Sequence, residues 1–140
     1  MEEIFMKRFK LCLIIALILC VLPLCCACGG GAHNIDKNDV TEIRFLRQNS
    51  DWTEEETETF IKLFNEAEYM GDERIGDTTP EYMVFVYYED GTYLQVNQFC
   101  IKHYYEVNEH KDGKGTSYRY YKRSAELEEF ILQLIDKYCG

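Results

Sequence analysis

The sequence predicts an α+β fold, in which two amphipathic helices cover one face of a mostly antiparallel sheet of four to five strands. Two segments, near residues 60–67 and 127–138, carry apolar residues at the spacing of a helix face. Between them, two strand-like segments flank Asp90-Gly91, a dipeptide typical of tight hairpin turns. The elements therefore follow the order β-α-β-β-β(-β)-α, and this grouping of strands favours an α+β architecture.

The first strand and the first helix are expected between residues 40 and 67. A strand at residues 40–47 places Ile43 and Phe45 on one face. The helix begins after Thr53, because Thr53 and Glu56 have the spacing of a capping box. The apolar stripe of this helix consists of Phe60, Ile61, Phe64 and Ala67. Such a stripe is expected to pack on the sheet.

The clearest hairpin joins YMVFVYY to YLQVNQF through a turn at Asp90-Gly91, which predicts a type I′ turn. One face of its first strand carries Met83, Phe85 and Tyr87, and the other carries Tyr82, Val84, Val86 and Tyr88. Because both faces are apolar, we expect this pair at the centre of the sheet. Further strands are expected at residues 102–107 and 116–122, joined by the polar loop NEHKDGKG.

The last helix is expected to start after Ser124, a favourable N-cap residue. Its apolar positions recur at helical spacing and comprise Leu127, Phe130, Ile131, Leu134, Ile135 and Tyr138. This stripe is expected to bury against the same face of the sheet as the first helix.

The first thirty residues have the three parts of a secretory signal. Basic residues precede an apolar segment at residues 11–24, and small residues follow. The uncharged run at residues 11–28 contains Pro23 and is short for a membrane span, which takes about 20 apolar residues. An uncleaved anchor and plain secretion are the alternatives. Because Glu2 and Glu3 are unusual in such a signal, translation from Met6 is an alternative to Met1.

The cysteines of this stretch resemble the acceptor site of a bacterial lipoprotein signal. Cys28 is the best acceptor, because Ala27 precedes it and glycines follow, with Cys25 and Cys26 as alternatives. The predicted organisation is a cleaved signal peptide at residues 1–27, a lipidated cysteine with a flexible tether at 28–39 and a single domain at 40–140. Two acyl chains hold a protein stably on a membrane. We therefore expect the protein on the extracytoplasmic face of the cell membrane.

The charge of the chain argues against nucleic acid as a partner. Without residues 1–27 the chain carries 12 basic and 23 acidic residues, a net charge of −11. A nucleic-acid-binding surface needs an excess of basic residues. Residues 102–123 are locally basic, with a net charge of +3. This segment is either an ordinary solvated surface or one that faces an anionic polymer.

Two cysteines remain besides the acceptor, Cys100 and Cys139. Disulfides persist outside the cytoplasm, so these two residues are a candidate bridge. A buried free thiol is the alternative.

No sequence motif for catalysis or nucleotide binding is present. The candidate polar cluster comprises His103, Glu106, Glu109, His110 and Asp112. His103 and Glu106 would point to opposite faces of a strand, and the loop residues lack the spacing of a calcium loop. We therefore expect no enzyme, no metal site and no cofactor. A metal-handling or hydrolytic role for residues 103–112 is the alternative.

Tyrosine is abundant, with 11 residues in the chain, most of them in predicted strands. Sheet propensity and burial in the core explain this distribution in part. Helices can cover only one face of the sheet, however, and the other face would present rings to solvent. The candidate binding surface consists of Tyr118, Tyr120, Arg119 and Arg123. Such a surface suits sugars, a cell-wall polymer or a protein partner.

Three sequence features between residues 40 and 138 are similar to those of a known group of proteins. They are a Pro-x-Tyr entry to a strand, a strand that ends in Asp-Gly, and a tyrosine-rich strand before the last helix. With the lipoprotein signal and the stretch TPEYMVFVYYEDGTY, they resemble small YhfM-like lipoproteins of Gram-positive bacteria. The resemblance implies fold and location and no particular activity. We expect a membrane-anchored, non-catalytic binding module of the cell envelope, whose partner is a wall polymer or an envelope protein.

Overall fold

The α+β architecture is confirmed by the computed structural model, which describes residues 34–46, 51–74, 79–98, 103–111, 113 and 115–140. The elements are η1 (Lys37–Asp39), β1 (Val40–Phe45), α2 (Glu54–Glu66), β2 (Glu68–Tyr69), β3 (Tyr82–Tyr88), β4 (Tyr93–Gln98), β5 (Tyr104–His110), β6 (Thr116–Arg123) and α3 (Ala125–Cys139). The strands form one antiparallel sheet of six strands in the order β1-β3-β4-β5-β6-β2.

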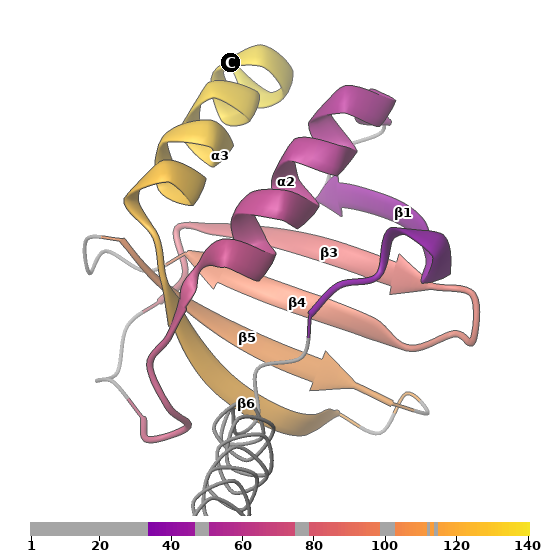
Figure 1. Ribbon diagram of the computed structural model, residues 1–140, viewed down its shortest axis with the longest axis vertical. Helices are drawn as coiled ribbons and strands as arrows, with labels where there is room; N and C mark the ends of the chain where they lie inside the picture. The colour runs from indigo at the N-terminus through magenta and orange to yellow at the C-terminus, as the bar shows by residue number, and fades with distance from the viewer. Residues whose placement is uncertain (1–33, 47–50, 75–78, 99–102, 112, 114) are drawn as a thin grey trace, which may run out of the picture. The chain divides into compact units, whose positions relative to one another are not determined.

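Both helices lie on the same face of the sheet (Figure 1). The predicted capping box of α2 is present: the Thr53 hydroxyl accepts from the Glu56 N–H at 3.2 Å, and the Glu56 carboxylate accepts from the Thr53 N–H at 2.8 Å. Ser124 caps α3 by accepting from the Leu127 N–H at 3.1 Å. These local hydrogen bonds satisfy N–H groups that have no partner within the helix, and they fix where each helix begins.

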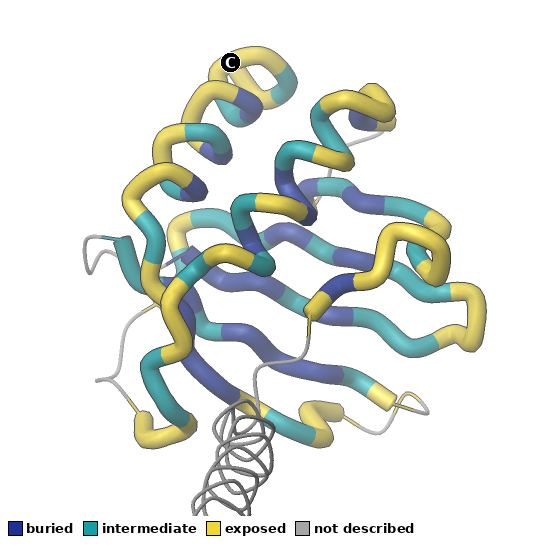
Figure 2. The backbone as a smooth tube through the Cα atoms, in the orientation of Figure 1, coloured by how far each residue is buried: buried dark blue, intermediate teal, exposed yellow. Residues whose placement is uncertain are grey.

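The core lies between the helices and the face of the sheet that they cover. Figure 2 shows buried positions alternating along β1 and β3, whereas β4, β5 and β6 each contain three consecutive buried residues. Val84, Val96 and Val107 are opposite one another on β3, β4 and β5, and each is at most 1% exposed. Trp52 packs between Phe45 and Phe60, with ring centroids 5.2 and 5.4 Å away. The single tryptophan therefore reports on packing between the sheet and α2.

The central hairpin consists of the predicted strands, but its turn differs from the predicted type I′ turn. Tyr88 and Thr92 close a loop of three residues, and only Gly91 has a positive φ, at 82°. A type I′ turn needs positive φ at both central residues, so the predicted turn type is wrong. The Asp90 carboxylate instead accepts from the N–H and the hydroxyl of Thr92, at 2.9 and 2.6 Å, and this holds the longer loop.

The sheet is larger than predicted. β2 pairs with β6 through Glu68 opposite Arg123 and Tyr69 opposite Lys122, and it adds a sixth strand at the edge. A strand of two residues is too short to show alternation in the sequence. β5 also continues to His110, beyond the predicted end at residue 107.

The segment before β1 is part of the folded unit, which spans residues 33–140. Ile35 is 2% exposed and belongs to the core. Its backbone N–H donates to the Asn65 side chain at 2.8 Å, and its carbonyl accepts from the same side chain at 2.9 Å. The predicted flexible tether therefore does not extend to Asp39. Its remaining residues, 28–33, lie outside the described residues.

Candidate functional site

Strand β6 divides the predicted binding residues between the two faces of the sheet. Tyr120 is opposite Val107, and both are completely buried on the face that the helices cover. Tyr118 lies on the same face, with its ring centroid 5.6 Å from that of Tyr120. Arg119 and Arg123 are exposed on the other face, because successive side chains of a strand alternate. The four residues therefore form no common surface, and the predicted grouping is wrong.

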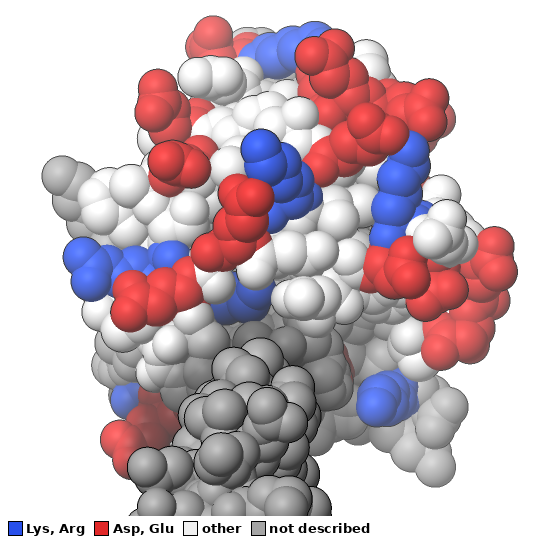
Figure 3. Space-filling model, in the orientation of Figure 1, with Lys and Arg blue, Asp and Glu red and all other residues white. Residues whose placement is uncertain are grey.

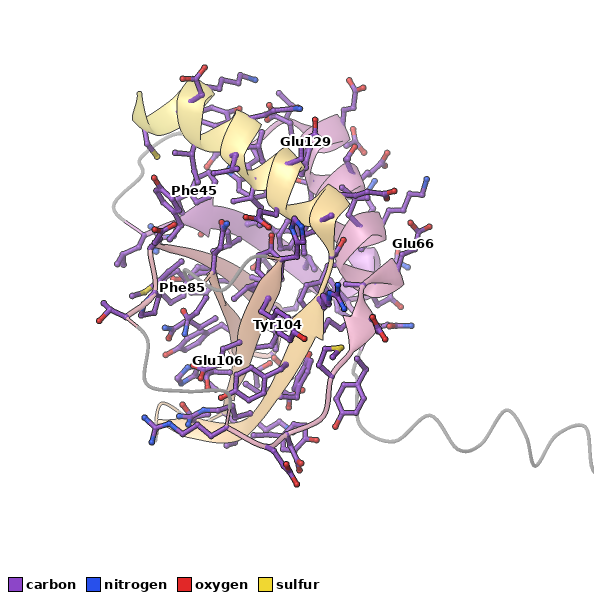
Figure 4. The ribbon with its side chains drawn as sticks, turned by 90° about the vertical axis from the view of Figure 1, so that its left-hand side faces the viewer. Phe45, Glu66, Phe85, Tyr104, Glu106 and Glu129 are labelled. Carbon is purple, nitrogen blue, oxygen red and sulfur yellow. The ribbon has the colours of Figure 1, made fainter. Side chains whose placement is uncertain are left out.

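The face of the sheet opposite the helices is covered by no helix in the described part of the chain, and we call it the open face. In Figure 4, Phe85 and Glu106 lie on the side of the strands away from Glu66 of α2. The open face consists of Glu42, Arg44, Met83, Phe85, Tyr87, Tyr93, Gln95, Asn97, Tyr104, Glu106, Asn108, His110, Arg119, Tyr121 and Arg123.

Aromatic side chains occupy one part of the open face. Phe85, Tyr87 and Tyr93 are half-buried and surround one another, with ring centroids 5.7–6.1 Å apart. The His110 ring stacks on Tyr93 at 4.4 Å and 9°. Arg44 lies over Tyr87, with its guanidinium carbon 5.1 Å from the ring centroid. These rings form a continuous apolar platform with a cation at its edge.

Polar side chains beside the aromatic rings are held by one carboxylate. The Glu106 Oε1 accepts from the amides of Asn97 and Asn108 at 3.2 and 2.8 Å, and its Oε2 accepts from the Tyr121 hydroxyl at 3.1 Å. Arg119 Nε donates to the Asn108 carbonyl oxygen at 3.0 Å and lies 3.7 Å from the Glu106 carboxylate. The network fixes the orientation of amide, carboxylate and guanidinium groups before any ligand is present.

The two parts of the open face adjoin in register. Phe85, Gln95, Asn108 and Arg119 are directly opposite one another across β3, β4, β5 and β6. Four neighbouring strands cover about 14 Å at a spacing of about 4.8 Å. Asn97, Asn108 and Tyr121 are at most 4% exposed, whereas the Arg119 side chain is 43% exposed. An elongated ligand that crosses the strands would therefore contact the aromatic platform and the Arg119 end of the polar network.

The sequence contained a signal for this face that the prediction did not use. In β4, Gln95 and Asn97 flank Val96, and in β5, Glu106 and Asn108 flank Val107. Polar residues at i and i+2 around a buried valine mark the face opposite the core. The focus on tyrosine and on β6 missed these amides.

The alternative site at residues 103–112 is dispersed in the structure. His103, at a positive φ of 70°, contacts the Glu128 carboxylate of α3 through Nδ1. Glu106 lies on the open face in the network described above. His103 and Glu106 are therefore occupied with separate partners.

The remaining residues of that alternative also separate. Glu109 is 5% exposed and points to the face of the helices, whereas His110 stacks on Tyr93 of the open face. Asp112 lies outside the described residues. Within the described ranges, no group of three His, Cys, Asp or Glu side chains is arranged to hold a metal ion. The described residues of this region therefore bring together no set of metal ligands.

The predicted cysteine sites are only partly described. Cys139, the last residue of α3, is exposed and forms no disulfide with another described residue. Cys100 and the predicted lipidation site Cys28 lie outside the described residues. The bridge between Cys100 and Cys139 and the acylation of Cys28 therefore stay predictions.

Comparisons with protein-family models, with curated proteins and with solved structures find no match to this chain. The helices of the described segments include none with the length and apolar character needed to cross a membrane.

Proposed function

We propose that this protein is a non-catalytic, lipid-anchored binding module of the cell envelope, and that its open face binds a cell-wall glycan. The observation that carries the proposal is the open face, where an aromatic platform adjoins an ordered row of amide, carboxylate and guanidinium groups.

The chemistry of the open face fits a chain of sugar rings. A sugar ring presents C–H groups on its faces, which pack on aromatic rings, and hydroxyls around its rim, which exchange hydrogen bonds with amides and carboxylates. Phe85, Tyr87 and Tyr93 supply the platform. Arg119 and Glu106 supply a donor and an acceptor that are already oriented. Because these groups are fixed in advance, binding costs less conformational entropy.

The proposed location follows from the N-terminal sequence. A signal peptide at residues 1–27 and diacylation of Cys28 would hold the protein on the extracytoplasmic face of the membrane. Because Ile35 is docked in the core, the tether is at most residues 28–33, and six extended residues span at most about 20 Å. This reach would hold the domain next to the membrane, in the inner layer of the wall. The resemblance to YhfM-like lipoproteins is in keeping with this placement.

The proposal is tested by retention on purified cell-wall sacculi that have been stripped of protein. Removal of an aromatic contact in Phe85→Ala, or of an exposed donor in Arg119→Ala, should weaken retention about tenfold or more. The matched control is Leu132→Ala, which removes a 45% exposed apolar side chain from α3. Equal retention of all variants, or equal loss in the control, contradicts the proposal.

A further inference from the structure

A cavity of about 450 Å³ lies at the end of the sheet where β3 turns into β4. Its walls come from η1 with the residues before it, the β3–β4 turn and the end of β5, three segments that Figure 1 shows at one end of the sheet. The Glu89 N–H donates to the Asp39 carbonyl at 3.0 Å and joins two of these walls. Cavities of about 300–1,000 Å³ are typical of small-molecule sites.

The cavity is strongly acidic. The carboxylates that line it are Asp36, Asp39, Glu89, Asp90 and Glu109. Lys111 is the one lysine or arginine among the lining residues that the structure describes, so the net charge of these described residues is −4 with His110 neutral. Figure 3 shows acidic side chains gathered at this end of the molecule. Glu109 is 5% exposed, which places one of the negative charges below the surface, where water screens it less.

Aromatic and apolar groups complete the walls. Tyr88, Tyr93 and Leu94 line the cavity, and the Tyr93 ring is stacked on His110. Burial raises the pKa of the Tyr88 hydroxyl, and the negative charges of Glu109 and Asp39 raise it further. The Tyr88 hydroxyl therefore stays protonated in a negative field. His110 Nε2 has no hydrogen-bond partner among the described residues, so in the appropriate tautomer it can accept a hydrogen bond from a ligand.

The arrangement of the charges distinguishes between a metal ion and an organic cation. The carboxylates come from three separate segments, and in the described residues no three acidic or histidine side chains converge as metal ligands do. Asp36 and Asp90 each accept hydrogen bonds from their own turns through Oδ1, which fixes them at separate points of the rim. Negative charges that come from three separate segments match a ligand whose positive charges are also spaced apart.

We propose that this cavity binds a small linear polyamine, with its ammonium groups paired to the carboxylates and its methylene chain against Tyr88, Tyr93 and Leu94. Ammonium groups and the methylenes beside them pack well on aromatic rings. The site is separate from glycan binding by the open face and does not rest on it, although Tyr93 and His110 border both.

The test is a calorimetric titration of the full chain in non-ionic detergent with spermidine at low salt. The proposal predicts saturable binding of one spermidine per chain, which physiological salt weakens. Asp39→Asn and Glu109→Gln should each weaken binding about tenfold or more, because each removes a charge-assisted contact. Trp52 fluorescence checks that each variant is folded. Since Glu109 is buried, Asp39→Asn decides the result if Glu109→Gln does not fold.

The matched control is Glu129→Gln, which removes one negative charge from an exposed position of α3 (Figure 4). No residue of α3 is among the described residues that line the cavity. This variant should leave spermidine binding unchanged, whereas a loss equal to that of Asp39→Asn would show attraction by net charge and overturn the proposal. Phe85→Ala on the open face should also leave binding unchanged, which separates this test from that of glycan binding.

Two further probes test the chemistry of the ligand. 1,8-Diaminooctane should compete with spermidine, and 1,8-octanediol, which has the same chain without charge, should not. Equal competition by the diol, or displacement of spermidine by calcium ions at lower concentration than by the diamine, overturns the polyamine assignment. Absence of saturable spermidine binding to the unmodified chain overturns it as well.

Discussion

Glu56 in the first turn of α2 accepts a hydrogen bond of 2.6 Å from the hydroxyl of Tyr138 in the last turn of α3. The same carboxylate accepts from Lys137 Nζ at 2.6 Å and from the Thr53 N–H at 2.8 Å. One side chain therefore caps α2 and joins the N-terminal end of this helix to the C-terminal end of the chain.

The first prediction concerns acid stability. Burial alone would raise the pKa of Glu56, but hydrogen bonds from Lys137, Tyr138 and Thr53 outweigh it and hold the pKa at about 2. The Glu56 carboxylate takes up a proton near pH 4.5 in the unfolded chain and only near pH 2 in the folded chain. The stabilisation by the ionised carboxylate is therefore complete above pH 4.5 and is lost as the pH falls to about 2.

Glu56→Gln should therefore lower the free energy of unfolding by about 1–2 kcal/mol at neutral pH. The difference from the unmodified protein should shrink towards pH 2. Urea unfolding followed by Trp52 fluorescence measures it, with the exposed neighbour in Glu55→Gln as control. A difference that stays constant over this range contradicts the assignment.

The second prediction concerns Lys122, which is 1% exposed. Its ammonium group donates to the Phe64 carbonyl at 2.6 Å, near the C-terminal end of α2, and lies 4.2 Å from the centroid of the Phe64 ring. Burial lowers the pKa of Lys122 to about 8. Between about pH 8 and 10.5 the unfolded chain therefore binds more protons than the folded one, and Lys122 makes stability rise with pH in this window.

Lys122→Met should remove this rise. The unfolding free energy of the variant should therefore depend less steeply on pH between about 8 and 10.5. The control is Lys62→Met, which removes an exposed lysine of α2 and should leave the slope unchanged. Parallel pH profiles for the unmodified protein and Lys122→Met would show that Lys122 stays protonated throughout.

The third prediction separates the two faces of the sheet by stability. Tyr120 is completely buried, so Tyr120→Ala should cost on the order of 3 kcal/mol or more. Tyr87 is half-buried on the open face, and Tyr87→Ala should cost about 1 kcal/mol. The Tyr120 hydroxyl has no hydrogen-bond partner within the part of the chain that the structure describes, so Tyr120→Phe should be neutral or slightly stabilising. Equal costs for Tyr120→Ala and Tyr87→Ala would mean that the faces are assigned wrongly.

The fourth prediction concerns attachment of the N-terminal segment. Asn65 binds both backbone groups of Ile35, so Asn65→Ala should release residues 34–36 while α2 stays folded. The free energy of unfolding is expected to fall by about 1–3 kcal/mol. Hydrogen exchange at the Ile35 amide should become faster, and Gln133→Ala, which removes an exposed amide of α3, should not change it. Unchanged protection of the Ile35 amide in Asn65→Ala would show that packing of the Ile35 side chain alone holds this segment in place.

Much of the fold could be predicted because its signals are local. Thr53 and Glu56 mark the start of α2 within four residues, and periodicity marks its buried stripe. β2 could not be predicted, because two residues show no period and their strand conformation depends on pairing with β6. The burial of Ile35 likewise depends on Asn65, 30 residues away in the sequence.

The candidate site was harder to predict than the fold. Alternation places Tyr120 and Arg119 on opposite faces, but both faces of the sheet carry aromatic residues. Tyrosine content therefore could not indicate which face the helices cover. The amides of β4 and β5 are the better guide, because they alternate with the core valines Val96 and Val107. Asn97 and Asn108 are at most 4% exposed, and their hydrogen bonds to Glu106 offset the cost of burial.

The most direct test of glycan binding by the open face is amide-resolved NMR during titration with soluble fragments of wall glycan. The side-chain NH₂ signals of Gln95, Asn97 and Asn108 report on the polar network, and the backbone signals of Phe85 and Tyr87 report on the platform. We predict saturable shifts at these positions, with α2 and α3 unchanged. Shifts confined to the helices, or none at saturating glycan, would contradict the account.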